Sequence, residues 1–284
     1  MRETVYYQRG APDPVLEDSL VLNIVRQYEP GAAAVTSIDD SHGEARAYAV
    51  DDNIILKVQR PQQLRSSTSL EKEVFFLKQL ERQTAVSVPR VLGYGKRGSV
   101  EYICMTRMPG IAAEYAKLTV PEKNKLLFKL GKELREIHRI DPNPFLESGL
   151  FPIDEPRDLT DRLLLRYKTA IQGKKDVSPE KRALTLNKVT EALQKIQDTD
   201  VFVALHVNPY IPHVFVDDTT HEYSGIIDFG DAYIGHPIFD MWYWKVSSRE
   251  TLLQGYTSAK PVGAAFQFIF DTANNIARIV NDMH

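Results

Sequence analysis

Hydrophobic and polar residues follow two different patterns along this 284-residue chain. In the first part, short apolar runs bounded by polar turns predict β-strands at 34–38, 45–50 and 53–58. Beyond residue 119, apolar residues recur mainly at helical spacing, as in the stripe from Leu126 to Ile137, which predicts amphipathic helices. A chain with strands first and mostly helices afterwards indicates an α+β fold.

The strand-rich part also contains two helical patterns. The first runs up to Tyr28, and Pro30 ends it. The second follows Thr68, whose spacing to Glu71 is that of a capping box. Its apolar face consists of Leu70, Val74, Leu77 and Leu80.

The change of pattern predicts a boundary between two lobes. A strand at 102–105 runs into Pro109 and Gly110, which together form a natural break. We therefore expect an N-terminal β-rich lobe at residues 1–107 and a mainly helical C-terminal lobe at 108–284. Helices of the second lobe are expected at 119–138, 158–171, 179–196, 239–256 and 262–283. We interpret His138 as a helix C-terminal histidine that is stabilised by the helix macrodipole.

Charge and cysteine content narrow the functional classes. The formal net charge is −3, which gives no sign of a nucleic-acid partner. Cys104 is the single cysteine, so an internal disulfide framework is excluded and a reducing compartment is indicated. No apolar run is long enough to span a bilayer, and the first ten residues lack the apolar core of a signal peptide. These features predict a cytoplasmic protein without a membrane or nucleic-acid partner.

Residues 201–231 combine three short strands with two loops that carry polar side chains. A strand at 201–205 is followed by His206, Val207 and Asn208, and the last strand ends in Asp228, Phe229 and Gly230. A carboxylate is a hard oxygen ligand, and a neighbouring glycine lets backbone and phosphate come close. The second loop is therefore a candidate for holding a divalent cation.

Lys57 lies inside the apolar strand at 53–58, and a lysine there needs a physical reason because burying an unpaired ammonium is costly. One interpretation is a lysine on an edge strand that faces water and discourages aggregation. The other is a lysine that contacts phosphate and pairs with a glutamate on the following helix.

The order of these motifs resembles that of the aminoglycoside phosphotransferase family, a branch of the protein-kinase-like superfamily. The resemblance spans roughly residues 41–240 and rests on the lysine strand, the glutamate helix, the Pro-Gly break, the His-x-Asn loop and the Asp-Phe-Gly-Asp turn. It implies a bilobal kinase-like fold, with an antiparallel sheet and one key helix in the first lobe. It also implies ATP or GTP as cofactor, together with Mg²⁺ or, as a second candidate, Mn²⁺.

The resemblance assigns roles to individual residues. Lys57 would contact the phosphates and pair with Glu73, with Glu71 as the fallback, while Asp228 would bind the metal. Ser41 and Gly43 lie in the hairpin that would cover the phosphates. The carbonyl of Thr106 and the amide of Met108 would bind the base at the hinge.

Four positions depart from the family pattern, and one of them is His236, which stands where the family has a later aspartate after glycine. Asn208 stands where the family has its catalytic aspartate, His213 where it has a second metal-binding asparagine, and Val207 where it has glycine. His206 matches the histidine that opens the catalytic loop and holds it to the metal-binding turn. An asparagine cannot take up a proton, but its carbonyl oxygen can still align a substrate hydroxyl. His213 could bind a metal, donate to a phosphate, or act as a displaced base.

We expect a small-molecule O-phosphotransferase that uses a nucleotide and a hydroxylated acceptor. The alternative is a nucleotide-binding pseudokinase that acts through a protein partner, which the substitutions at Asn208 and His213 favour. A third class, an α+β binding module, would require the ordered motifs to be coincidence. The acceptor cannot be read from the sequence: antibiotics, sugars, choline-like compounds and nucleosides remain open.

Overall fold

The computed structural model describes residues 15–39, 44–60, 69–97, 100–153, 158–175, 177–196, 202–242 and 244–282. The chain forms two compact units, and each is built from segments distant in sequence. The sheet unit comprises Met1–Glu122, Ser148–Pro152 and His206–Ala232, and the helical unit comprises the remainder. The lobe boundary after residue 107 stays a prediction.

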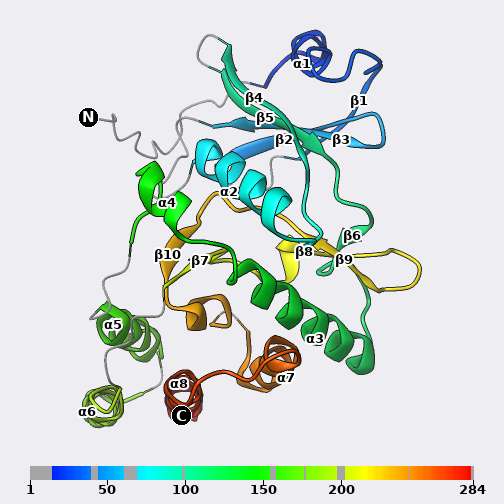
Figure 1. Cartoon of the computed structure of the whole chain (residues 1–284). Helices are drawn as coiled ribbons and strands as arrows, with labels where there is room; N and C mark the ends of the chain where they lie inside the picture. Colours follow the sequence, from blue (N-terminus) through cyan, green and yellow to red (C-terminus); the bar gives the residue numbers. More distant parts are fainter. Residues whose placement is uncertain are drawn as a thin grey trace. The chain divides into compact units, whose positions relative to one another are not determined.

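A five-stranded antiparallel sheet is the centre of the sheet unit (Figure 1). Its strands occur in the order β1-β2-β3-β5-β4, and every neighbouring pair is antiparallel. This confirms the mixed fold with an N-terminal antiparallel sheet. Because β3 pairs on both sides, Lys57 is not on an edge strand, and that interpretation was wrong. The strands are β1 (Val35–Asp39), β2 (Ala45–Val50), β3 (Ile54–Gln59), β4 (Val91–Arg97) and β5 (Val100–Thr106).

The two faces of β2 have different surroundings because successive side chains point to opposite sides of a strand. Tyr48 and Val50 are fully buried in a hydrophobic core together with residues of α1 (Asp18–Val25). Ala45, Ala47 and Ala49 alternate with them and line a pocket on the other face. One strand therefore supplies both a packed core and a surface of small side chains.

Helix α2 (Leu70–Gln83) lies along the sheet (Figure 1) and begins one residue later than the capping-box pattern implies. Ser69 is its N-cap, and the Ser69 hydroxyl accepts a hydrogen bond from the amide of Lys72 at 3.4 Å. The shift gives Glu71 no capping-box role, since the N3 position is Lys72. Glu73 lies on the buried side of the helix and is 1% exposed.

The residues just after β5 form the first strand of a second, three-stranded sheet, whose other two strands come from much later in the chain. It consists of β6 (Ile111–Ala112), β8 (Val214–Val216) and β9 (Tyr223–Ile226), all antiparallel. The hydroxyl of Ser224 donates to the carbonyl of Pro109 at 2.7 Å. Gly110 has φ +86°, and a Cβ there would lie 2.0 Å from the carbonyl oxygen of Val216. Only glycine fits this approach, so the Pro-Gly break is fixed against β8 and β9.

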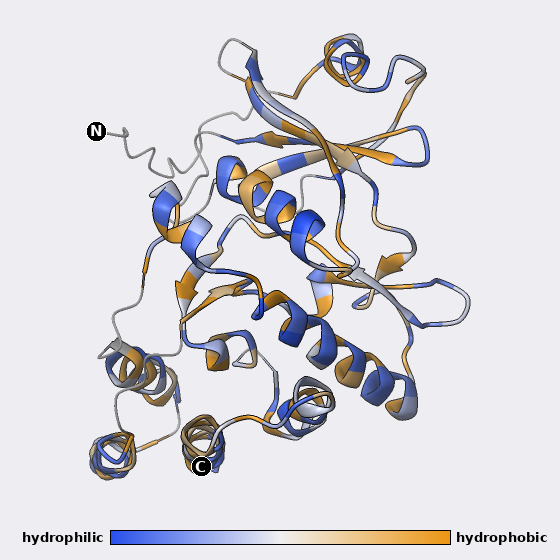
Figure 2. Cartoon of the chain, in the orientation of Figure 1, coloured by the Kyte–Doolittle hydropathy of each residue, from blue (hydrophilic) through white to orange (hydrophobic). Residues whose placement is uncertain are grey.

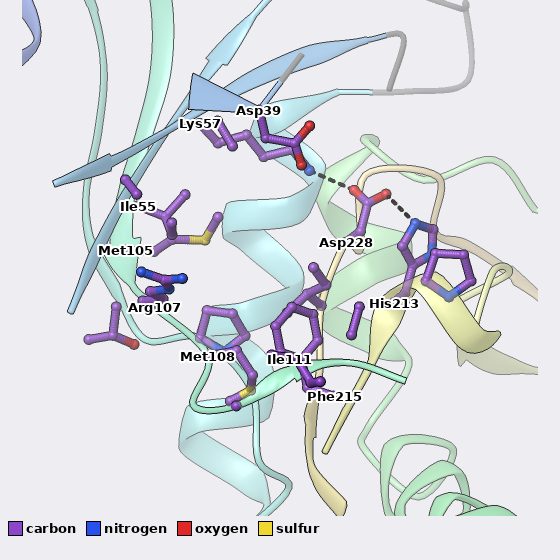
Figure 3. Close-up of a pocket in the computed structure, with 18 of the residues that line it drawn as sticks. Asp39, Ile55, Lys57, Met105, Arg107, Met108, Ile111, His213, Phe215 and Asp228 are labelled. Carbon is purple, nitrogen blue, oxygen red and sulfur yellow. Dashed lines mark hydrogen bonds and ion pairs between the residues drawn. The ribbon is translucent and has the colours of Figure 1, made fainter. Parts of the chain in front are cut away.

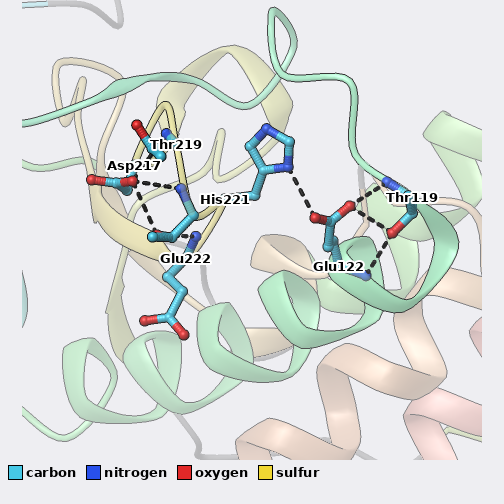
Figure 4. Close-up of polar contacts among 7 residues, drawn as sticks. Thr119, Glu122, Asp217, Thr219, His221 and Glu222 are labelled. Carbon is cyan, nitrogen blue, oxygen red and sulfur yellow. Dashed lines mark hydrogen bonds and ion pairs between the residues drawn. The ribbon is translucent and has the colours of Figure 1, made fainter.

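The turn between β8 and β9 is tied to the first turn of α3 (Val120–Ile137) (Figure 4). A capping box is present here: Glu122 accepts from the amide of Thr119 at 2.7 Å, and Thr119 accepts from the amide of Glu122 at 3.5 Å. His221, with φ +58°, contacts the other oxygen of Glu122 at 3.0 Å. Hydrogen bonds from Thr119 and then His221 lower the pKa of Glu122 to about 2.

The helical unit contains most of α3, the two-stranded sheet of β7 and β10, and further helices. Hydrophobic and hydrophilic positions alternate around α3 (Figure 2), and its leucine stripe is buried as expected. The expected helix at 239–256 was wrong at its start, because a 3₁₀ turn at Pro237–Asp240 comes first and α7 begins at Val246. The other elements are α4 (Asn143–Ser148), α5 (Asp158–Gln172), α6 (Pro179–Leu193), α7 (Val246–Thr257), α8 (Ala264–Asn281), β7 (Val203–Leu205) and β10 (Tyr233–Gly235).

His138 has side-chain partners that the macrodipole interpretation did not include. Its ring nitrogens lie 2.8 Å from a carboxylate oxygen of Asp240 and 3.0 Å from the hydroxyl of Tyr256, and all three residues are buried. The histidine is thus part of a buried polar cluster. Among the described helices, none is both long and apolar enough to cross a membrane.

Candidate functional site

Three charged side chains from different parts of the sequence meet in the sheet unit, and Figure 3 shows two of them, Lys57 and Asp228. The ammonium of Lys57 lies 2.7 Å from Oε2 of Glu73 and 2.6 Å from Oδ1 of Asp228. Lys57 and Asp228 are 171 positions apart in the chain. The sequence predicted this convergence, and the structure places all three residues together.

Each of the three side chains is presented by a different element. Lys57 projects from the middle of β3, and Glu73 comes from the first turn of α2. Asp228 follows β9 and has φ +73°, a left-handed conformation that costs a non-glycine residue free energy. The amide of Ser69 donates to the carbonyl of Gly230 at 3.3 Å, which attaches the start of α2 to the Asp228 turn.

The protonation equilibria of the three groups reflect their burial and mutual attraction. Burial alone would lower the pKa of Lys57, but Asp228 and Glu73 raise it well above its ordinary value. Burial alone would raise the pKa of Asp228, but Lys57 and then His213 hold it well below its usual range. Burial raises the pKa of Glu73, and the attraction of Lys57 only partly opposes this. The centre therefore keeps a charged lysine and a charged Asp228 at neutral pH.

His213 lies on the opposite side of Asp228 from Lys57 (Figure 3). Its Nε2 is 3.3 Å from Oδ2 of Asp228, and its Nδ1 is 2.8 Å from the backbone carbonyl of Asn208. A carbonyl oxygen can only accept, so Nδ1 carries a proton and donates it to Asn208. Nε2 is therefore the nitrogen that faces Asp228.

The loop at 206–208 is held by its own histidine. Nε2 of His206 lies 2.9 Å from the carbonyl of Ile227, and Nδ1 of His206 accepts from the amide of Asn208 at 3.2 Å. His206 is fully buried and connects the loop to the residue before Asp228. Val207, between these residues, has φ +77°, an unfavourable conformation for a β-branched side chain. The glycine expected from the resemblance would adopt it without strain.

A pocket of about 410 Å³ adjoins the Lys57, Glu73 and Asp228 cluster. Thr106 and Met108, the two predicted hinge residues, line it, and so does His213. Among the described residues, Asn208 and His206 do not line this pocket. Ser41 and Gly43 lie outside the described residues.

Other pocket residues were missed by the sequence analysis. The alanines at every second position of β2 were a signal, because small side chains on one face of a strand leave space for a ligand. Asp39, Glu114 and Tyr115 also line the pocket and had no motif to mark them. The negative charge of Glu114 raises the pKa of the Tyr115 hydroxyl most, followed by loss of solvent, a hydrogen bond with Glu114 and the charge of Asp39.

The donor atoms fit a divalent cation that is shared with a phosphate ligand. The described residues contain no group of three or more histidine, cysteine, aspartate or glutamate side chains that could hold a metal alone. Asp228 and His213 supply one oxygen and one nitrogen. Cations that bind nucleotides commonly take one or two protein ligands, and phosphates and water complete the shell. The residues present are therefore sufficient for such an ion.

Comparison with known proteins gives matches of two kinds. The sequence profile of the phosphotransferase enzyme family matches residues 37–260. No curated protein matches the sequence. Several solved structures have a similar fold.

Among these is the GDP complex of an aminoglycoside 2'-phosphotransferase-IIIa, with a TM-score of 0.68 and 16% identity over 93% of this chain and 87% of that chain. The macrolide 2'-phosphotransferase MphH from Brachybacterium faecium has a TM-score of 0.63 and 16% identity, covering 92% of this chain and 88% of its own. A ternary complex of APH(2")-IIa with streptomycin and ATP has a TM-score of 0.61 and 16% identity, covering 95% and 93%. At this level of identity the likeness concerns the fold. Because the family profile covers well over half of the chain, the protein belongs to the phosphotransferase enzyme family and has the kinase-like fold of the aminoglycoside and macrolide phosphotransferases.

Proposed function

We propose that this protein transfers the terminal phosphoryl group of ATP or GTP to a hydroxyl group of a small molecule. The observation that carries the proposal is the contact of Lys57 with Asp228 beside the pocket, at 2.6 Å. Phosphoryl transfer requires little covalent chemistry from the protein. It requires a cation on the phosphates, a divalent metal ion and an aligned acceptor, so a lysine next to a metal-binding carboxylate is the expected arrangement.

Each residue has a specific task in this proposal. Lys57 contacts the phosphates, and Glu73 holds its ammonium in place. Asp228 and His213 bind the metal ion, Mg²⁺ or Mn²⁺, which neutralises charge on the phosphates when bound. The carbonyl of Thr106 and the amide of Met108 bind the base at the far end of the pocket.

Asn208 aligns the acceptor hydroxyl in this proposal. Its side-chain carbonyl accepts a hydrogen bond from the hydroxyl, and no side-chain base removes the proton. Loss of a general base costs roughly two to four orders of magnitude in rate, so slow turnover is expected. Asn208→Asp should then raise turnover at least about tenfold. An unchanged rate in a folded, nucleotide-binding variant would exclude this role.

Nucleotide binding is tested by thermal unfolding with ATP or GTP, each with and without a divalent metal. Ligand that binds the folded state at about 100 times its Kd adds about 2.7 kcal/mol of stability, which is easily measured. Lys57→Met should abolish the nucleotide shift, whereas Lys96→Met, which changes an exposed lysine of β4, should keep it. The absence of any shift with the unmodified protein would reject the proposal.

The acceptor is sought by measuring nucleotide consumption with a panel of hydroxylated compounds. The similar structures include complexes with kanamycin and streptomycin, so aminoglycosides and macrolides come first. Sugars, choline-like compounds and nucleosides follow.

A second candidate function is a nucleotide-binding pseudokinase that acts through a protein partner. Asn208 in place of the catalytic aspartate and the strained Val207 favour it. A thermal shift with nucleotide, combined with no turnover in either the unmodified protein or Asn208→Asp, would support this function instead.

A further inference from the structure

His213 and Asp228 each direct one atom that could bind a metal ion to the same point in space. Nε2 of His213 and Oδ2 of Asp228 are 3.3 Å apart, while the other oxygen of Asp228 is bonded to Lys57. Both facing atoms carry lone pairs when the ring is neutral. Two acceptors so close repel each other unless a positive charge lies between them, and either a proton on Nε2 or a metal ion supplies that charge.

The histidine ring is oriented as in metal sites. Histidines that bind metals usually donate their second ring N–H to a carbonyl or carboxylate, which fixes the tautomer and the ring plane. His213 donates Nδ1–H to the carbonyl of Asn208, and that carbonyl also accepts from the amide of Tyr210 at 2.9 Å. The ring of Tyr210 packs edge-on against His213 at 5.5 Å.

The backbone holds the two donors in register. The amide of Ile227, the residue before Asp228, donates to the carbonyl of His213 at 3.0 Å. His213 ends a 3₁₀ turn that contains Pro212 and leads into β8, and β8 pairs with β9, the strand before Asp228. The nitrogen–oxygen separation is therefore set by a sheet and not by flexible loops alone.

The separation suits one metal ion bound to both atoms. Zn²⁺, taken as a reference for a first-row ion, binds histidine nitrogen and carboxylate oxygen at about 2.0–2.2 Å. Two ligands at such distances are about 3.0 Å apart at a right angle and about 3.4 Å apart at a tetrahedral angle. The observed 3.3 Å lies in this range.

The donor pair selects the kind of ion. Mg²⁺ prefers oxygen ligands, whereas imidazole suits transition ions. Mn²⁺ shares the preference of Mg²⁺ for carboxylate and phosphate oxygens, but it belongs to the first-row transition series and accepts an imidazole nitrogen more readily than Mg²⁺ does, so of these two ions it matches the protein pair and a nucleotide better. We infer that His213 makes this centre a manganese-selective site, in which Mn²⁺ is bound by Nε2 of His213, Oδ2 of Asp228 and the nucleotide phosphates. The inference rests on the proposed nucleotide function for the phosphate ligands.

The experiment measures the metal itself and does not depend on turnover. Mn²⁺ is added to the full-length protein with a non-hydrolysable ATP analogue, and bound Mn²⁺ is studied by pulsed electron paramagnetic resonance. A directly bound imidazole gives a ¹⁴N coupling, and uniform ¹⁵N labelling of the protein changes the isotope and separates it from the nitrogens of the nucleotide. Competition with Mg²⁺ gives the metal preference.

The decisive variants are His213→Asn and His213→Gln. Both should lose the imidazole coupling, and the preference for Mn²⁺ over Mg²⁺ should fall by about tenfold or more, as when a metal's ligand shell is disturbed. His221→Asn is the matched control. His221 belongs to the same unit, its partner is Glu122, and asparagine tolerates its φ of +58°. This control should keep both the coupling and the preference.

The outcomes separate the two proposals. Thermal protection by nucleotide without a protein nitrogen coupling, or with an unchanged preference in folded His213→Asn, would overturn the manganese inference and leave the phosphotransferase proposal standing. A protein that gains no thermal protection from nucleotide with either metal would overturn both.

Discussion

Replacing Lys57 with methionine removes the only cation that the structure places within hydrogen-bonding distance of both Glu73 and Asp228 among the described residues. Methionine keeps much of the length and apolar volume of lysine, so the main change is electrostatic. The side chain of Glu73 is 2% exposed, and its carboxylate would be left buried without its partner. We expect a loss of about 3 kcal/mol in the free energy of unfolding at pH 7.

The magnitude follows from two opposing limits. At an effective dielectric constant of about 20, unit charges 2.7 Å apart attract by about 6 kcal/mol, before the cost of removing them from water. The lone carboxylate of Glu73 can escape its penalty by binding a proton. From its ordinary pKa of 4.5, this costs about 1.36 kcal/mol per pH unit, or about 3.4 kcal/mol at pH 7. The penalty from Glu73 therefore cannot exceed that value.

The titration of Glu73 also determines how the stability of Lys57→Met changes with pH. In Lys57→Met the pKa of Glu73 in the folded state lies above its value in the unfolded state, so the folded state binds more protons. The penalty is small near pH 4.5 and grows as pH rises. At pH 5.5 the limit is only about 1.4 kcal/mol.

The assay is urea unfolding followed by far-UV circular dichroism. Both tryptophans, Trp242 and Trp244, belong to the helical unit, so their fluorescence does not report directly on the sheet unit. The double variant Lys57→Met/Glu73→Gln removes the uncompensated charge and should be more stable than Lys57→Met alone at pH 7. A double variant that is equally or less stable, or a penalty that does not shrink at pH 5.5, would refute the reasoning.

Three further changes test other parts of the structure. Val207→Gly should stabilise the protein by about 1 kcal/mol in urea unfolding, because it releases the strain of φ +77°. Gly110→Ala should cost more than about 2 kcal/mol and weaken nucleotide protection, since its Cβ would collide with the carbonyl of Val216. His236→Asn should flatten the pH dependence of stability between pH 7.5 and 4.5. Burial, and then His138, lower the pKa of His236 to about 4, so the unfolded state binds more protons. Stability therefore decreases by about 2.5 kcal/mol as the pH is lowered from about 7.5 to about 4.5.

Each of these changes has a control. Val214→Gly removes a buried side chain from β8 and should destabilise, so a gain limited to Val207→Gly would isolate the strain. Gly149→Ala has a similar positive φ of +63° but no atom within 4 Å of its Cβ, and an equal loss at both glycines would exclude the collision. The asparagine side chain in His236→Asn can still accept from the amide of Ile238, as His236 does. An unchanged slope in that variant would show that His236 does not titrate in this range.

Much of the fold could be predicted because it depends on local pattern. The strands β2 and β3 lie within one residue of their predicted ranges, since alternation and a polar turn define them. The cluster of Lys57, Glu73 and Asp228 was also predictable, because each residue lies in a motif with a known place in the fold. The start of α7 was not, since Pro237 begins a 3₁₀ turn that apolar spacing cannot distinguish from a helix.

The remaining features depend on contacts between distant residues. The partners of His138, Asp240 and Tyr256, lie 102 and 118 positions away, and no local signal indicates either pairing. The bond from His213 to the backbone of Asn208 depends on a loop conformation that spacing alone does not determine. Such details decide which nitrogen of a histidine is available, and therefore which chemistry it can perform.

The alanines on β2 have a consequence for engineering. They border the pocket, whereas Tyr48 and Val50 pack into a separate core, so a larger side chain at Ala47 would reduce the cavity without touching that core. Under the proposed function, a series of such replacements would produce versions of the protein that accept only nucleotides trimmed to fit the smaller pocket. Such pairs of variant and reagent would then allow the proposed activity to be switched separately from that of the kinases in the same cell.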